Sequence, residues 1–164
     1  MRHRIFIAIN LPENVKKELV NYQSKWPELP VRWTGKDNLH ITLEFLGYLT
    51  DEELLKACQD TKTLASKHEP FLITLNKICY GPPKKPPRMI WVVGEKVEEL
   101  NFSPHITLGR MNAWEFRKIE PEERPQVDED INLSFEVNSI EVMESVLKRT
   151  GPTYNVIESC QLKS

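Results

Sequence analysis

Two short segments of the chain share the same four residues, and each places a histidine two positions before a threonine. They are residues 40–43 and 105–108, both His-Ile-Thr-Leu. At average residue usage, such a repeat arises by chance in a chain of this length on the order of one time in six. The setting strengthens the signal, because each copy lies in a strand-like run and follows an earlier apolar run, residues 5–9 and 89–93. An internal duplication is the simplest interpretation.

Strand geometry places the histidine and the threonine of each copy on one face. Successive side chains of a strand point to opposite faces, so His40 lies beside Thr42 and His105 beside Thr107. The opposite faces carry Ile41, Leu43 and Phe45 in the first copy, and Ile106 and Leu108 in the second. Burying unpaired imidazoles and hydroxyls costs a few kcal/mol each, so the polar face is not a second core face. If a pseudo-twofold axis relates the two halves, both pairs converge on one cleft.

Two imidazoles with two hydroxyls between them suit an in-line displacement at phosphorus. A neutral imidazole can take a proton from the attacking water while a protonated one donates to the leaving oxygen, and a pKa of about 6.5 keeps both forms available. We therefore take His40 and His105 as catalytic candidates. The hydroxyls of Thr42 and Thr107 can hold the non-bridging oxygens. Arg110 can add a charge-assisted contact to the same phosphate.

Simpler interpretations compete with this one. Two histidines on a sheet surface can be purely structural, which is what we expect of His3 and His68. Two imidazoles can also bind zinc, but a zinc site needs a third ligand. Glu44 accompanies only the first copy, where the alternation places it on the His40 face, flanking the site. The sequence therefore predicts no metal and no cofactor.

The elements that position these residues follow from hydrophobic periodicity and capping signals. One helix should follow Pro12 and end before Pro27, with an apolar face that includes Trp26. A second should begin at a capping box of Thr50 and Glu53 and run to about residue 67. Residues 111–130 are polar and irregular. Strands are expected near residues 5–9, 31–33, 39–46, 71–75, 89–93, 105–109, 133–137, 140–147 and 154–162. The pattern predicts an α+β (α/β-like) fold.

Composition limits the class of protein. The chain has 164 residues, 40% of them hydrophobic and 28% charged, which fits one globular domain. A formal charge of −2 argues against coating duplex nucleic acid through a broad basic surface. Three scattered cysteines argue against a disulfide framework. Residues 5–9 are too short for a signal-peptide core, and no stretch approaches a membrane span, so a cytoplasmic location is expected.

Other basic and aromatic side chains could contact a nucleic acid, but a structural or solvated position is expected for them. The basic run at residues 84–88 is expected to be a solvated loop. Trp26 and Trp91 are assigned to the core. Ordinary packing, rather than stacking on a nucleobase, is expected for Trp33, Tyr48, Tyr80 and Tyr154.

The paired tetrapeptides, together with residues 103–110 (Ser-Pro-His-Ile-Thr-Leu-Gly-Arg) and the phrase Gly-Pro-x-Tyr at 151–154, resemble the two-histidine phosphoesterase superfamily. Within it the chain is most similar to the RNA 2′,3′-cyclic phosphodiesterases, also called 2′-5′ RNA ligases. The resemblance implies a single bilobal phosphoesterase domain over residues 1–164. Its two pseudo-twofold-related lobes would hold mainly antiparallel sheets flanking a central cleft, with helices outside.

The resemblance also implies an activity: metal-independent hydrolysis of terminal RNA 2′,3′-cyclic phosphates to 2′-phosphomonoesters, with 2′-5′ ligation as the reverse reaction. His40 would be the proton donor to the departing 3′-oxygen and His105 the base on water. The expected partners are RNA ends or nucleotides with a 2′,3′-cyclic phosphate. Neither a membrane nor an obligate protein partner is expected, and the protein is expected to be a monomer.

One feature departs from the family pattern. Eleven residues separate Val93 from His105, too few for the helix that family members usually carry there. Either this is a shortened variant or a segment is missing from the sequence. The shortened half motivates an alternative function, a non-catalytic binder of nucleotides or RNA ends that uses the same pocket. A different cyclic-phosphate substrate, such as a small nucleotide, is a further alternative.

Overall fold

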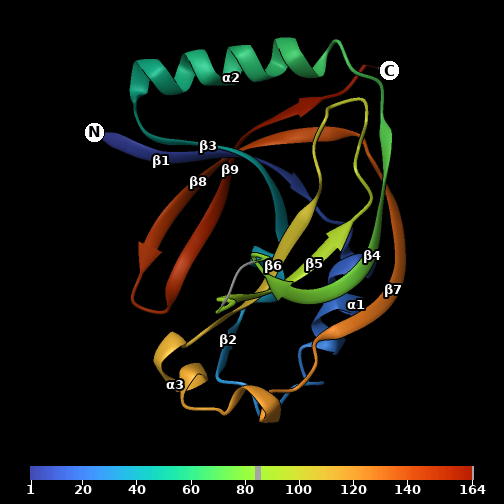
Figure 1. Cartoon of the computed structure of the whole chain (residues 1–164). Coiled ribbons are helices and arrows are strands. Elements are labelled where there is room, and N and C mark those ends of the chain that lie inside the picture. Colours follow the sequence, from blue (N-terminus) through green and yellow to red (C-terminus); the bar gives the residue numbers. More distant parts are fainter. Residues whose placement is uncertain (84–85, 164) are drawn as a thin grey trace.

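The computed structural model describes residues 1–83 and 86–163, and it is built around one open antiparallel sheet (Figure 1). Nine strands form this sheet, and all registered pairs are antiparallel. They are β1 (Arg2–Asn10), β2 (Val31–Trp33), β3 (His40–Thr50), β4 (Phe71–Gly81), β5 (Met89–Gly94), β6 (His105–Met111), β7 (Asp128–Val137), β8 (Ser139–Lys148) and β9 (Gly151–Gln161). The expected α+β fold with mainly antiparallel strands is confirmed.

The strand order is symmetrical about the two strands that begin with histidine. It runs β7-β4-β5-β6-β3-β1-β8-β9, with β2 beside β6. Strands β6 and β3 meet at the centre, and three more strands extend outward from each of them. The registered pair that joins them is Ile41 with Ile106, both fully buried. One half is continuous in sequence, from β4 to β7, whereas the other combines β1 and β3 with the late strands β8 and β9.

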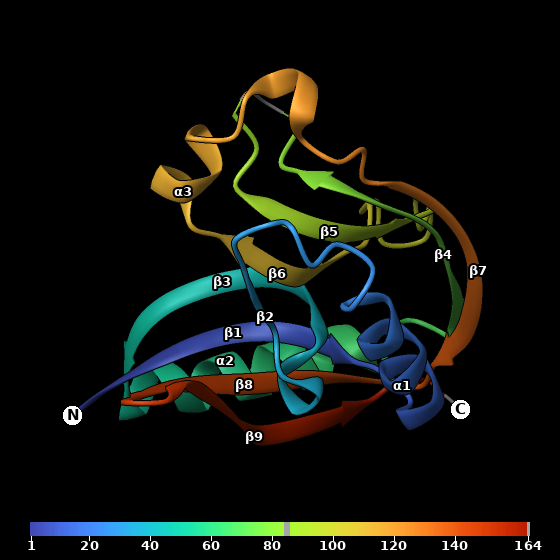
Figure 2. The same ribbon diagram turned by 90° about the horizontal axis from the view of Figure 1, so that it is seen from below.

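The helices lie next to the strands of the sheet, as Figure 2 also shows. They are α1 (Glu13–Tyr22), α2 (Asp51–Ala65), α3 (Ala113–Arg117) and the 3-10 turns at Lys36–Asn38 and Pro121–Glu123. Helix α2 begins at the expected capping box: the Glu53 amide donates to Thr50 Oγ1, and the Thr50 amide donates to the Glu53 carboxylate. It packs on β3, β8 and β9, across one half of the sheet (Figure 1). None of the described helices is long and apolar enough to cross a bilayer.

Two predicted boundaries are wrong. The first helix ends at Tyr22, four residues before Trp26: the Gln23 amide donates to the Val20 carbonyl in a tighter turn, and its side chain donates to the carbonyls of Thr34 and Leu108. Trp26 is nevertheless buried, as expected, and stacks on Trp33. The segment 111–130 is also more ordered than predicted. It contains α3, which is capped by Asn112 and buries Phe116 in the core.

The connection between β5 and β6 is a turn rather than a helix, as its length requires. Residues 95–104, all of them described, close on themselves through a bridge between Val97 and Phe102. The Gly94 amide then donates to the Pro104 carbonyl at 3.2 Å, which brings the chain straight into β6. Within the basic run at 84–88, Lys84 and Lys85 lie outside the described residues.

Candidate active site

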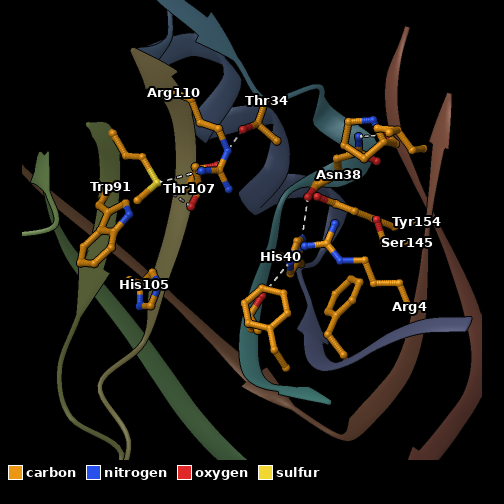
Figure 3. A pocket seen from close by; sticks show the side chains of 16 residues that line it. Arg4, Thr34, Asn38, His40, Trp91, His105, Thr107, Arg110, Ser145 and Tyr154 are labelled. Carbon is orange, nitrogen blue, oxygen red and sulfur yellow. Dashed lines mark hydrogen bonds between the residues drawn. The ribbon is translucent and has the colours of Figure 1, made fainter. Parts of the chain in front are cut away.

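The five residues expected to do chemistry line one pocket at the centre of the sheet. His40, Thr42, His105, Thr107 and Arg110 border a cavity of about 390 Å³. Figure 3 shows His105, Thr107 and Arg110 on one wall and His40 on the facing wall. The complete lining is Arg4, Phe6, Thr34, Asn38, His40, Thr42, Phe45, Met89, Trp91, His105, Thr107, Arg110, Ser145, Leu147, Pro152 and Tyr154.

The pairing of the two motif strands explains why both imidazoles reach the same pocket. Ile41 is in antiparallel register with Ile106, and each is the second residue of its tetrapeptide. In an antiparallel pair, the residue before one partner lies across from the residue after the other. His40 and Thr107 therefore flank this registered pair at one end, and Thr42 and His105 flank it at the other. The two buried isoleucines hold the strands together behind the polar face.

Two hydrogen bonds hold the His40 ring. Nδ1 lies 2.7 Å from the carbonyl oxygen of Asn38, so this nitrogen must carry a proton and donate it. Nε2 lies 2.9 Å from Oγ1 of Thr42 and faces the pocket hydroxyl. The ring also contacts the edge of Tyr154, with the two centroids 5.1 Å apart, and packs on Phe6. Nε2 is thus the nitrogen left to exchange a proton with a substrate.

Burial lowers the pKa of His40 below its ordinary value. The hydrogen bond to the Asn38 carbonyl opposes this effect, because it stabilises the protonated ring. The positive charges of Lys16 and of a protonated His105 lower the pKa further. The second of these effects is the one expected of two imidazoles that share a pocket.

An aromatic stack holds the His105 ring. Its centroid lies 4.2 Å from that of Trp91, and the two ring planes are inclined by 23°. Burial is the cause that lowers the pKa of His105 below its ordinary value. This histidine is consequently more stable in the neutral form, the form required of a general base.

The anion-binding candidates on β6 now point at a weak acceptor. Oγ1 of Thr107 and Nη1 of Arg110 lie 3.9 and 3.4 Å from the sulfur of Met89. A thioether accepts hydrogen bonds poorly, so a phosphate oxygen is a better partner for both donors. The Thr107 backbone is fixed separately, because Thr34 Oγ1 donates to its carbonyl at 2.8 Å. These donors are therefore available to an anion in the pocket.

Irregularities in the pairing of β3 with β1 correct two sequence assignments. The register shifts between Ile5 and Phe6 and again between Ile7 and Ala8, and each shift is a bulge that reverses the alternation of faces. Phe45, expected on the core face, therefore lines the pocket and is 69% exposed. Glu44, expected beside His40, instead lines a hollow beneath α2.

Two aromatic assignments also change. Trp91, expected in the core, lies in the pocket wall against His105, because it shares the face of β5 that carries Met89. Tyr154, expected to serve ordinary packing, touches His40. Its place in the Gly-Pro-x-Tyr phrase was the one available signal. Arg4 was missed altogether, because nothing in β1 distinguishes this arginine from a solvated one.

A family model described as LigT-like phosphoesterase matches residues 9–91, slightly more than half of the chain. The chain belongs to the LigT-like phosphoesterase family. Curated relatives agree with this assignment. The "RNA 2′,3′-cyclic phosphodiesterase" of Methanocaldococcus jannaschii is 31% identical over 94% of this chain and 98% of its own. The protein of the same name from Thermotoga maritima is 26% identical over 98% of this chain and 96% of its own.

Solved structures support the LigT-like fold over the entire chain. The protein TT0787 of Thermus thermophilus superposes with a TM-score of 0.83 at 28% identity and covers 98% of both chains. E. coli LigT complexed with phosphate superposes with a TM-score of 0.78 over 99% of both chains; at 24% identity this similarity concerns the fold alone. The protein is accordingly an enzyme of the phosphoesterase class.

Proposed function

We propose that this phosphoesterase hydrolyses the 2′,3′-cyclic phosphate at the end of an RNA to a 2′-phosphomonoester. The observation that carries the proposal is the shared pocket, in which two imidazoles, two threonine hydroxyls and Arg110 surround a space of about 390 Å³. The names of the relatives from M. jannaschii and T. maritima, both called RNA 2′,3′-cyclic phosphodiesterase, support the same substrate. The substrate, the reaction and the residue roles below belong to this proposal.

The different supports of the two rings favour His40 as the acid and His105 as the base. The Asn38 carbonyl accepts from Nδ1 of His40 and so stabilises the protonated ring that an acid needs. His105 lies on an apolar indole surface, where burial favours the neutral ring that a base needs. Burial lowers the pKa of both rings, so the difference that favours these roles is the Asn38 carbonyl, which opposes this effect at His40 and has no counterpart at His105 among the described residues.

The proposed reaction is a single in-line displacement. His105 removes a proton from water, and the water oxygen forms a bond to phosphorus opposite the 3′-oxygen. The bond between phosphorus and the 3′-oxygen breaks, and His40 donates its Nε2 proton to that oxygen. The products are a free 3′-hydroxyl and a 2′-phosphate, and a later proton exchange with solvent restores both imidazoles. The same displacement with a 5′-hydroxyl in place of water as the nucleophile, and with the 3′-oxygen again as leaving group, would give a 2′-5′ linkage.

The negative charge that develops on the non-bridging oxygens is stabilised from both strands. Thr42 and Thr107 supply neutral hydroxyl donors, and Arg110 supplies a charged one. Since residues from both halves line the pocket, we also propose that residues 1–164 act as one bilobal unit. The lining comes from one chain, which is compatible with the further proposal that the protein is a monomer.

The direct test is hydrolysis of an oligoribonucleotide that ends in a 2′,3′-cyclic phosphate. We expect one product, the 2′-phosphate, and an unchanged rate in excess EDTA, because the proposed chemistry uses side chains alone. Product identity is checked by phosphorus NMR or by resistance to a 3′-phosphatase. Loss of turnover in EDTA, restored by a divalent ion, would contradict the mechanism. Calorimetric binding of the same substrate without turnover would instead support the non-catalytic alternative.

The pH dependence of kcat/KM should be bell-shaped, with its maximum below pH 6.5, the approximate pKa of an unperturbed histidine. The rate falls at low pH because the base must be neutral, and it falls at high pH because the acid must be protonated. Burial lowers the pKa of both rings, so both limbs move toward acid pH. A bound phosphodiester anion stabilises imidazolium, so the profile of kcat should lie at higher pH than that of kcat/KM. A kcat/KM that rises steadily from about pH 6.5 to about pH 8.5 would contradict this assignment.

A further inference from the structure

The contact between Trp91 and His105 is one layer of a three-layer stack. Trp91 lies on β5, which pairs with β4 on one side and with β6 on the other. His105 comes from β6 and covers the indole at 4.2 Å. Gly81 lies on the β4 side of the indole. It pairs with Met89 of β5, which is two residues from Trp91 and therefore on the same face of that strand. Gly81 and His105 therefore meet the indole from opposite sides.

The lack of a side chain at Gly81 makes room for this arrangement. A Cβ built there would lie 2.3 Å from Cδ2 of Trp91 and within 2.8 Å of two further ring atoms. Such a short distance to three atoms of one ring means that the indole rests directly on the Gly81 backbone. Any side chain at this position would have to push the indole toward His105.

The stack holds the ring of His105 in place, whereas hydrogen bonds hold the ring of His40. The His40 ring is fixed through Nδ1 and Nε2 by Asn38 and Thr42. Within the described part of the chain, the indole face is what defines the ring plane of His105. The indole itself is held by packing rather than by a hydrogen bond, because its buried Nε1 has no partner among the described atoms and its ring lies between close neighbours.

We propose that Trp91, seated on Gly81, is the positioning residue for His105. This inference rests on the proposed function, in which His105 removes the proton from water. The indole acts through the imidazole and not on the substrate: it holds the ring plane at the angle at which a ring nitrogen meets the attacking water. The connection between β5 and β6 is a short turn rather than a helix, so it brings no helix beside His105.

Kinetics of three variants test the proposal. Trp91→Leu keeps an apolar side chain but removes the flat surface, so kcat should fall about 10- to 100-fold, the cost of a misplaced catalytic group, with KM within about two-fold. Trp91→Phe retains an aromatic face and should recover most of the loss. The control is Trp114→Leu, the same substitution at an exposed tryptophan on α3, which should leave kcat unchanged.

Gly81→Ala disturbs the stack at the face of the indole opposite His105. Gly81 has no positive φ, and the atoms that an added Cβ would meet most closely are those of the Trp91 ring. We expect kcat to fall as in Trp91→Leu, and the double variant to lose little more, because both changes disturb one unit. Gly35→Ala is the matched control, since a Cβ at Gly35 meets nothing within 4 Å and its φ of −62° suits alanine.

A fluorescence titration tests the stack without any substrate. A protonated imidazole in contact with an indole quenches its emission, so emission should fall as pH drops through the titration of His105. The change should disappear in both Trp91→Phe and His105→Gln, and it should persist in His40→Gln. If it persists in Trp91→Phe, or if Trp91→Leu keeps wild-type kcat, the inference is overturned. If the wild-type protein shows this pH-dependent change in emission but does not hydrolyse the cyclic phosphate, the proposed function is contradicted and the stack is not.

Discussion

Replacing either pocket histidine with alanine is expected to lower kcat on a 2′,3′-cyclic phosphate by about 10²- to 10⁴-fold, the usual contribution of general acid–base catalysis. His105→Ala removes the group that takes the proton from water. His40→Ala removes the group that protonates the leaving 3′-oxygen. The measurement is single-turnover hydrolysis with enzyme in excess, which excludes product release from the rate.

The two variants should also differ from each other. A substrate whose leaving group needs no proton, such as a 4-nitrophenyl phosphodiester, should recover most of the activity of His40→Ala and little of that of His105→Ala. His68→Ala, outside the pocket, serves as the control. Equal recovery by both variants would contradict the assigned roles, and full activity of the double variant would remove the basis of the proposed function.

Removing the hydroxyl of Thr107 should cost about 10²- to 10³-fold in kcat, the range measured for single donors to a developing oxyanion. Thr107→Val preserves the shape and the strand preference of the residue and deletes only the donor. KM should change little, because the negative charge that the donor stabilises grows mainly in the transition state. Thr42→Val should show a similar loss, with an added change in the pH profile since this hydroxyl also contacts Nε2 of His40.

Thr74→Val provides the matched control for both threonine variants. Thr74 lies on β4, where its hydroxyl pairs with Ser134 at an exposed position. This change should leave kcat unaltered. A loss of less than about three-fold in both Thr42→Val and Thr107→Val would show that the hydroxyls do not act on the transition state.

The sequence predicted the motif strands well because their signals are local. The tetrapeptides carry both the alternation of faces and the chemistry, and the capping box of Thr50 and Glu53 fixes the start of α2. The structure indeed brings the five predicted site residues to one pocket. The sequence could supply this convergence only through an assumed symmetry, since no local pattern specifies that Ile41 pairs with Ile106.

The residues that were misplaced depend on long-range contacts. Phe45 and Glu44 exchange faces because β1 and β3 pair with bulges, which the β3 sequence does not show. Trp91 resembles any buried aromatic residue in a strand until Gly81 and His105 are seen on its two sides. Tyr154 reaches His40 only because β9 joins the sheet through β8.

Because of the strand order in the sheet, the strands that form the two walls of the pocket are completed at different stages of synthesis on the ribosome. The wall that carries His105 uses neighbouring strands, β4 to β7, and can close soon after they emerge. The wall that carries His40 cannot be completed until later. Strand β1 lies between β3 and β8, and it lacks its second neighbour until residues 139–148 are translated. The histidine synthesised first is thus the one whose surroundings are completed last.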